Sequence, residues 1–169
     1  MRAIVCISGE IASGKTTIAR ALAEHFRDGA VRSFGNVVRE QALSEGKPLD
    51  RATLQEVGLS LVAVGWPSFV DALLEGLPPS IELLVVEGIR HREAVDEIAR
   101  RNLSDKLLIV YLQVDRRVQA ARQQDRGESF RSRTHTVEFY LSEVQAMADL
   151  VVDGSLPVGE IVEAVIQRL

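Results

Sequence analysis

Cysteine is almost absent from this sequence, which contains only Cys6 among its 169 residues. One cysteine cannot form an internal disulfide, and the histidine, cysteine and acidic residues nowhere show the spacing of a metal site. We therefore expect a protein of the cytoplasm, where thiols stay reduced. Cys6 lies in an apolar run, so we interpret it as a small buried residue of a strand rather than a reactive thiol.

Long apolar runs, repeats and an excess of positive charge are also missing. The apolar run near the N-terminus is short and leads into a loop with glycine and lysine, so we predict neither a signal peptide nor a membrane span. There are 20 lysines and arginines against 24 acidic residues, and the net charge of -4 predicts no general affinity for nucleic acid. The expected partner is a small molecule, and the sequence leaves the oligomeric state open.

Short apolar runs alternate with segments of helical periodicity along the whole chain. Most of the runs are almost continuously apolar, which is typical of parallel strands covered on both faces. The alternation predicts a single α/β domain, residues 1–169, with a doubly wound parallel five-stranded sheet, helices on both faces and ligands at the carboxyl ends of the strands. The predicted strands are Ala3–Ser8, Ala30–Phe34, Ile81–Glu87, Leu107–Val114 and Leu150–Val152.

The segment GEIASGKT, residues 9–16, lies between the first predicted strand and the first predicted helix. It fits the Walker A pattern G-x-x-x-x-G-K-[ST], in which the backbone N–H groups of a glycine-rich loop surround phosphates. Lys15 supplies positive charge for the outer phosphates and Thr16 a hydroxyl for Mg²⁺. We therefore predict ATP as the phosphate donor and Mg²⁺ as the metal. The predicted donor-binding residues are Gly9, Ala12, Ser13, Gly14, Lys15, Thr16 and Thr17.

Two classes of phosphate-loop protein do not suit this chain. A GTPase needs an Asn-Lys-x-Asp segment to read guanine, and the sequence contains none. A motor or helicase core needs a longer chain. The length is typical of a small-molecule kinase.

The segment SFGNVVRE, residues 33–40, resembles the acceptor-binding segment Ser-Thr-Gly-Asp-x-x-Arg of adenylate kinases. Gly35 and Arg39 match that pattern, whereas Phe34 and Asn36 replace threonine and aspartate. In adenylate kinases the glycine approaches the acceptor nucleotide and the arginine binds its phosphate. The resemblance implies the same roles for Gly35 and Arg39.

Later segments extend the resemblance over nearly the whole chain. VEGIR, residues 86–90, is similar to the Asp-Gly-Ile-Arg segment of nucleoside monophosphate kinases, with Glu87 in the aspartate position and Arg90 as the arginine. ARQQDRGESFRSR, residues 121–133, resembles the start of their lid, with Arg122 and Arg126 on one helical face. ADLVVDGS, residues 148–155, is similar to a strand near the end of dephospho-CoA kinases and cytidylate kinases.

The chain therefore resembles the P-loop nucleoside monophosphate kinase-like family. The resemblance implies the P-loop NTPase fold, an acceptor-binding helical insertion at residues 35–79 and a short lid at residues 122–136. It also implies a metal site at Thr16 and Glu87 and an acceptor site at Gly35, Arg39 and Arg90. The implied catalytic residues are Lys15, Arg90, Arg122 and Arg126.

The implied activity is an ATP-dependent phosphotransferase whose acceptor is a nucleoside monophosphate or a related phosphorylated nucleoside metabolite. A hydroxyl acceptor, as in dephospho-CoA kinases or nucleoside kinases, generally needs a carboxylate base. No carboxylate occurs in residues 32–36, just after the second predicted strand, which favours a phosphate acceptor. Glu87 or Asp115 remains available as a base, so the hydroxyl acceptor stays an alternative. A non-enzymatic ATP-dependent switch is a third.

The individual segments also have structural interpretations. Arg39 could be a solvated helix residue, and Glu87 and Arg90 could pair with each other at the end of a strand. Trp66, followed by Pro67, could stack on a base or could only pack at the start of a helix. The lid arginines, namely Arg122, Arg126, Arg131 and Arg133, could form no more than a charged surface.

Overall fold

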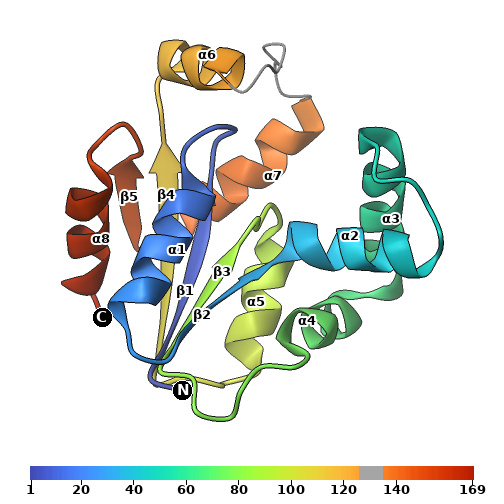
Figure 1. Ribbon diagram of the computed structural model, residues 1–169, viewed down its shortest axis with the longest axis horizontal. Coiled ribbons are helices and arrows are strands. Elements are labelled where there is room, and N and C mark those ends of the chain that lie inside the picture. Colours follow the sequence, from blue (N-terminus) through green and yellow to red (C-terminus); the bar gives the residue numbers. More distant parts are fainter. Residues whose placement is uncertain (126–134) are drawn as a thin grey trace.

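A five-stranded, fully parallel sheet forms the centre of the protein, with strand order β2-β3-β1-β4-β5. The computed structural model describes residues 1–125 and 135–169. Helices cover both faces of the sheet, which confirms the predicted doubly wound architecture (Figure 1). The strands are β1 (Ala3–Gly9), β2 (Gly29–Ser33), β3 (Leu83–Glu87), β4 (Lys106–Gln113) and β5 (Leu150–Asp153).

Six of the eight described helices contribute buried apolar residues to the two faces of the sheet. Apolar residues of α1 and α8 pack on one side of β1, and those of α2, α4, α5 and α7 pack on the other. The helices α2, α3 and α4 all lie in the segment between β2 and β3. The helices are α1 (Lys15–His25), α2 (Phe34–Ser44), α3 (Arg51–Val64), α4 (Trp66–Leu74), α5 (Arg92–Arg100), α6 (Arg116–Asp125), α7 (His135–Ala146) and α8 (Val158–Ile166).

The strand β1 is buried along its whole length because it lies in the middle of the sheet. Cys6 in this strand is completely buried, which confirms its interpretation as a structural residue. Burial raises the pKa of the Cys6 thiol to about 12, so the thiol stays protonated at neutral pH. In the register of the sheet, Ile7 of β1 lies opposite Glu87 of β3 and Val110 of β4. The carboxyl ends of these three strands therefore meet at one edge.

The predicted second strand extends one residue too far, because Phe34 is the first residue of α2. Its ring packs edge-on against Phe69, with the ring centroids 4.9 Å apart, and also contacts Trp66. Both partners belong to α4, so the tertiary contact turns the chain into a helix where the apolar run alone predicted a strand.

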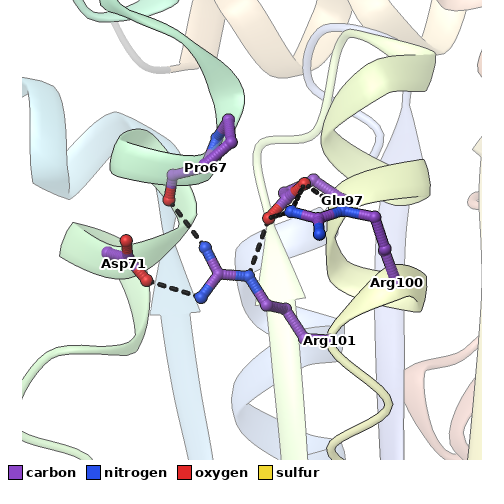
Figure 2. A network of polar contacts seen from close by, with 5 residues as sticks. All are labelled: Pro67, Asp71, Glu97, Arg100 and Arg101. Carbon is purple, nitrogen blue, oxygen red and sulfur yellow. Dashed lines mark hydrogen bonds and ion pairs between the residues drawn. The ribbon is translucent and has the colours of Figure 1, made fainter.

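A polar network links α4 to the end of α5 (Figure 2). The guanidinium of Arg101 donates to Asp71 Oδ1 at 2.6 Å, to the carbonyl of Pro67 at 2.9 Å and to Glu97 Oε1 at 2.7 Å. Arg100 also pairs with Glu97, whose side chain is 7% exposed. These bonds hold the pKa of the Glu97 carboxyl below its usual value, Arg100 contributing most and Arg101 next. The network fixes α4 against α5, and these two helices flank the segment after β3.

Among the described residues no single helix is long and apolar enough to cross a membrane. The helices α3 and α4 pass that test of length and composition only when taken together, and the chain bends by 113° between them.

Candidate active site

The predicted phosphate-binding loop, residues 9–16, connects the end of β1 to the start of α1, at the edge where the strands end. Three of its residues have positive φ angles: Gly9 at 141°, Ala12 at 58° and Gly14 at 91°. A Cβ at Gly9 would lie 2.2 Å from the carbonyl oxygen of Leu112, so β4 leaves room only for glycine there. Successive backbone groups in such alternating conformations form the concave N–H surfaces that bind anions.

The side chain of Lys15 curls back over this loop. Its ammonium donates to the carbonyl of Gly9 at 3.1 Å, to the carbonyl of Glu10 and to Ser13 Oγ at 3.3 Å. A positive charge is therefore held at the mouth of the loop, together with the N-terminus of α1. Both attract the negative charge of a phosphate.

Thr16 and Glu87 come together although they are 71 positions apart in the sequence. The Thr16 hydroxyl donates to Glu87 Oε2 at 2.8 Å, from the first turn of α1 to the end of β3. Glu87 therefore contacts the loop, and within the described part of the chain it forms no salt bridge with Arg90.

A hydroxyl and a carboxylate are the hard oxygen ligands that Mg²⁺ prefers, with phosphates and water completing its shell. Within residues 1–125 and the described part after 134, no group of three or more His, Cys, Asp or Glu side chains could hold a metal by itself. Thr16 and Glu87 offer two oxygen ligands, so the predicted Mg²⁺ site would need phosphates and water for the remaining positions.

The segments after β2 and β3 approach each other closely. A Cβ built on Gly88 would lie 3.6 Å from the backbone nitrogen of Gly35 and 3.6 Å from Ser33 Oγ. Arg39 lies beside Gly35, because a Cβ built on Gly35 would be 3.4 Å from Arg39 Nη1. This nitrogen also donates to Asn36 Oδ1 at 2.9 Å. Gly35 and Arg39 are thus brought next to the segment that carries Arg90.

Arg90 presents exposed surface, yet the protein around its guanidinium lowers its pKa by desolvation, and the charge of Arg51 lowers it further. Arg51, the first residue of α3, is a neighbour that the sequence did not predict for this site. Two arginines this close repel each other and are stabilised by a shared anion. The helix start there is defined by Asp50, which caps the backbone N–H groups of Ala52 and Thr53 at 3.0 and 3.1 Å.

Aromatic rings line up next to this arginine region. The Trp66 ring stacks on Phe69 at 5.8 Å and contacts His91 at 5.3 Å, and His91 in turn contacts Tyr140 of α7 at 4.2 Å. Burial lowers the pKa of His91, so its imidazole is neutral at pH 7. Trp66 therefore packs at the start of α4 among other rings, one of the two roles that its sequence allowed.

Arg122 of α6 lies against the phosphate-binding loop. Its guanidinium donates to the carbonyl of Ala12 at 3.1 Å and to the carbonyl of Gly154 at 3.0 Å. It forms one wall of a cavity of about 310 Å³, which we call the donor cavity. The cavity is lined by Ser13, Gly14, Thr17, Ile18, Arg122, Asp125, Gly154, Leu156, Val158 and Ile161.

Arg126, Arg131 and Arg133 lie outside the described residues, as does most of the segment 122–136. The catalytic roles assigned to Arg122 and Arg126 remain predictions. Sequence reasoning also missed Glu10, a variable position of the Walker A pattern, whose carboxylate binds Gln119 of α6. No local pattern marks such a contact.

These features can be compared with known proteins, although no family model matches the chain. UPF0200 protein PH1008 of Pyrococcus horikoshii is 26% identical over 162 residues, which cover 88% of this chain and 86% of that protein. The tunicamycin resistance protein of Deinococcus radiodurans has a similar structure, with a TM-score of 0.69 at 23% identity over 99% of this chain and 95% of that one. Shikimate kinase of Aquifex aeolicus has a TM-score of 0.58 at 15% identity, with 98% and 94% covered.

The chain has the P-loop kinase fold. The whole-length overlap with shikimate kinase extends beyond the phosphate-binding loop to the helices between β2 and β3. The predicted fold class, a five-stranded parallel sheet of the P-loop NTPase type with helices on both faces, is thereby confirmed.

Proposed function

We propose that this protein is a kinase that transfers the γ-phosphoryl group of ATP, with Mg²⁺, to a nucleoside monophosphate or a related phosphorylated nucleoside metabolite. The observation that carries the proposal is the 2.8 Å hydrogen bond between Thr16 and Glu87 beside the Walker A lysine. It brings the hydroxyl of Thr16, the residue after Lys15 in the phosphate-binding loop, into contact with the carboxylate of Glu87. Phosphoryl transfer depends on such positioning and on positive charge around the moving group.

In this proposal each part of the chain has a distinct task. The backbone of the phosphate-binding loop and Lys15 hold the donor phosphates, and Thr16 and Glu87 hold Mg²⁺, which neutralises charge on those phosphates. The donor cavity beside Thr17 and Gly154 receives the rest of ATP. Arg122 on the cavity wall adds positive charge.

The acceptor site is the region around Gly35, where the segments after β2 and β3 meet. Arg39 and Arg90 would bind a phosphate already present on the acceptor, and the charge of Arg51 favours an anion there. An ionised phosphate needs no base to become a nucleophile. The residues directly after β2, Phe34, Gly35 and Asn36, offer no carboxylate, which agrees with that chemistry.

A hydroxyl acceptor is the second candidate, and a specific comparison favours it. Shikimate kinase, which shares the fold, acts by its name on shikimate, a compound with hydroxyl groups and no phosphate. In this version Glu87 would have to accept the proton of the hydroxyl as well as bind Mg²⁺.

The test is a screen for ADP release with ATP and Mg²⁺ present. Candidate acceptors are ribo- and deoxyribonucleoside monophosphates, nucleosides, dephospho-CoA and shikimate, and Lys15→Ala is the control for dependence on the phosphate-binding loop. We expect a nucleoside monophosphate to stimulate ADP release well above basal hydrolysis. Stimulation only by acceptors that would be phosphorylated on a hydroxyl group, namely nucleosides, dephospho-CoA or shikimate, would favour the hydroxyl acceptor. No stimulation by any acceptor would favour an ATP-dependent switch.

A further inference from the structure

Glu10 belongs to the phosphate-binding loop, but its carboxylate is bound by groups outside that loop. Its Oε2 accepts a hydrogen bond from the backbone N–H of Val114 at 3.2 Å and a short one from the side-chain amide of Gln119. Val114 follows the end of β4, and Gln119 lies on α6. A residue of the loop therefore connects it to a helix far along the chain.

Helix α6 is attached to the protein mainly by polar groups. Within Arg116–Asp125 the buried residues are Gln119 and Gln123, 7% and 1% exposed, and no apolar side chain of this helix is buried. Gln119 also donates to the carbonyl of Val114 at 3.1 Å. Most surface helices are held by an apolar stripe. Here the position of the helix depends on hydrogen bonds.

Arg122 lies one helical turn after Gln119, on the same face of α6. Its two hydrogen bonds reach the carbonyls of Ala12 and Gly154. The helix thus contacts the phosphate-binding loop at two points, Glu10 and Ala12. In Figure 1 it lies beyond the carboxyl end of β4, where the loop also lies.

We propose that Glu10 is a positioning residue that, through Gln119, holds α6 and with it Arg122 against the phosphate-binding loop. A hydrogen bond to a charged carboxylate is stronger than one between neutral groups, and removing it leaves the buried Gln119 amide poorly satisfied. If α6 is free to move, it must become ordered before Arg122 can contact a ligand. The free-energy cost of that ordering weakens ligand binding. The effect on nucleotide binding rests on the proposed function, whereas the effect on α6 does not.

The first measurement is hydrogen–deuterium exchange of the protein without nucleotide. In both Glu10→Ala and Gln119→Ala we expect the amides of α6 to exchange roughly tenfold faster, with α8 unchanged. Gln124→Ala, an exposed glutamine on the same helix, is the matched control and should exchange like wild type. Unchanged exchange in α6 would overturn the proposal. If Glu10→Ala does not fold, Gln119→Ala gives the same answer.

The second measurement is the equilibrium affinity for a fluorescent ATP analogue with Mg²⁺. We expect Glu10→Ala and Arg122→Ala each to weaken binding about tenfold, and the double variant to be no weaker than Arg122→Ala, because Glu10 acts through Arg122. Additive losses would overturn this role of Glu10.

A swap of the two partners gives a rescue test. Gln119→Glu alone places two carboxylates together and should weaken binding, whereas Glu10→Gln combined with Gln119→Glu restores a carboxylate–amide pair and should recover part of the loss. Failure of the swap to recover any affinity would count against the pair. A wild-type protein that does not bind the analogue would refute the proposed function, and the exchange data alone would then decide the role of Glu10.

Discussion

Replacing Gly154 with alanine tests whether the donor cavity binds ATP. Gly154 follows β5, and its N–H donates to the carbonyl of Gln113 at 2.7 Å while its carbonyl accepts from Arg122 at 3.0 Å. A Cβ at this position would lie 2.6 Å from the carbonyl oxygen of Ser13 and 2.9 Å from Val114 Cγ1. Since ordinary contacts begin near 3.4 Å, the Ser13 oxygen must move by roughly 0.8 Å. The loop that surrounds the phosphates moves with it.

The cost of this displacement follows from how the neighbours are held. Ser13 is completely buried, and Val114 lies on the second side of the new methyl group, so neither can move freely. Overpacking of this kind costs about 2 kcal/mol. For a chain of this length that lowers Tm by roughly 4–8 °C. A shift of the loop by a fraction of an ångström should also weaken ATP binding by about tenfold to a hundredfold.

The assay combines thermal unfolding with the affinity for a fluorescent ATP analogue. Gly159→Ala is the matched control, because a Cβ on Gly159 meets no atom within 4 Å and alanine suits the first turn of α8. That variant should be as stable as wild type or more stable, by up to about 1 kcal/mol, with the same affinity for ATP. A Gly154→Ala protein with the wild-type Tm and affinity would refute the steric argument. A Gly154→Ala protein with a lower Tm but the wild-type affinity for the ATP analogue would show that the donor cavity does not bind ATP.

Three further predictions concern the loop, the acceptor region and the network of Figure 2. Lys15→Ala should lower the rate of transfer by roughly 100- to 1,000-fold with little change in Tm, measured by steady-state kinetics and thermal unfolding. Arg39→Ala and Arg90→Ala should each lower kcat/KM for the acceptor about 10- to 100-fold at nearly constant ATP affinity, and lysine at either position should rescue only partly. Glu97→Gln should lower Tm at pH 7, because the pKa of Glu97 is lowered in the folded state and its ionised form stabilises the fold. The difference in Tm from wild type should persist above about pH 4.3, the ordinary pKa of glutamate, and should shrink as the pH falls below that value.

Each of these predictions has an outcome that contradicts it. Full activity of Lys15→Ala would remove the assignment of the phosphate-binding loop. Wild-type acceptor kinetics in both arginine variants would make Arg39 and Arg90 surface residues, and efficient turnover of an acceptor without a phosphate would exclude their role. A difference in Tm between Glu97→Gln and wild type that stays constant down to pH 3 would show that the charge of Glu97 does not stabilise the link between α4 and α5.

Much of the fold is determined locally. The continuous apolar runs of β1 and β4 identify buried parallel strands, since both faces of such a strand are covered and its side chains are apolar on both. The phosphate-binding loop is recognisable for the same reason: its glycines, lysine and threonine are adjacent in sequence, and one strand–loop–helix unit suffices to present them. Apolar residues three and four apart likewise identify α8, of which Ile161, Val162 and Val165 are buried.

The ends of helices and strands and the burial of charged side chains depend on tertiary contacts that no local sequence pattern predicts. Phe34 begins a helix because rings of α4 receive it. Glu97 looks like a solvated helix residue in the sequence, yet Arg100 and Arg101 allow its burial by pairing with it. Burial of a carboxylate is tolerated only with such partners, and only tertiary structure supplies Asp71 to complete the network.

The sequence by itself determined the sheet, the phosphate-binding loop and the residue types available for phosphate chemistry, because each arises from neighbours along the chain. Only the tertiary structure decided which of them meet. Thr16 reaches Glu87 because β1 and β3 are adjacent in the sheet, and Gly35 meets Gly88 because β2 lies on the other side of β3. Glu10 reaches Gln119 because β4 carries the chain back to the loop before α6 begins. Parallel strands end at one edge whatever their order in the sequence, so strand order, set by packing on both faces of the sheet, determines which side chains share a site.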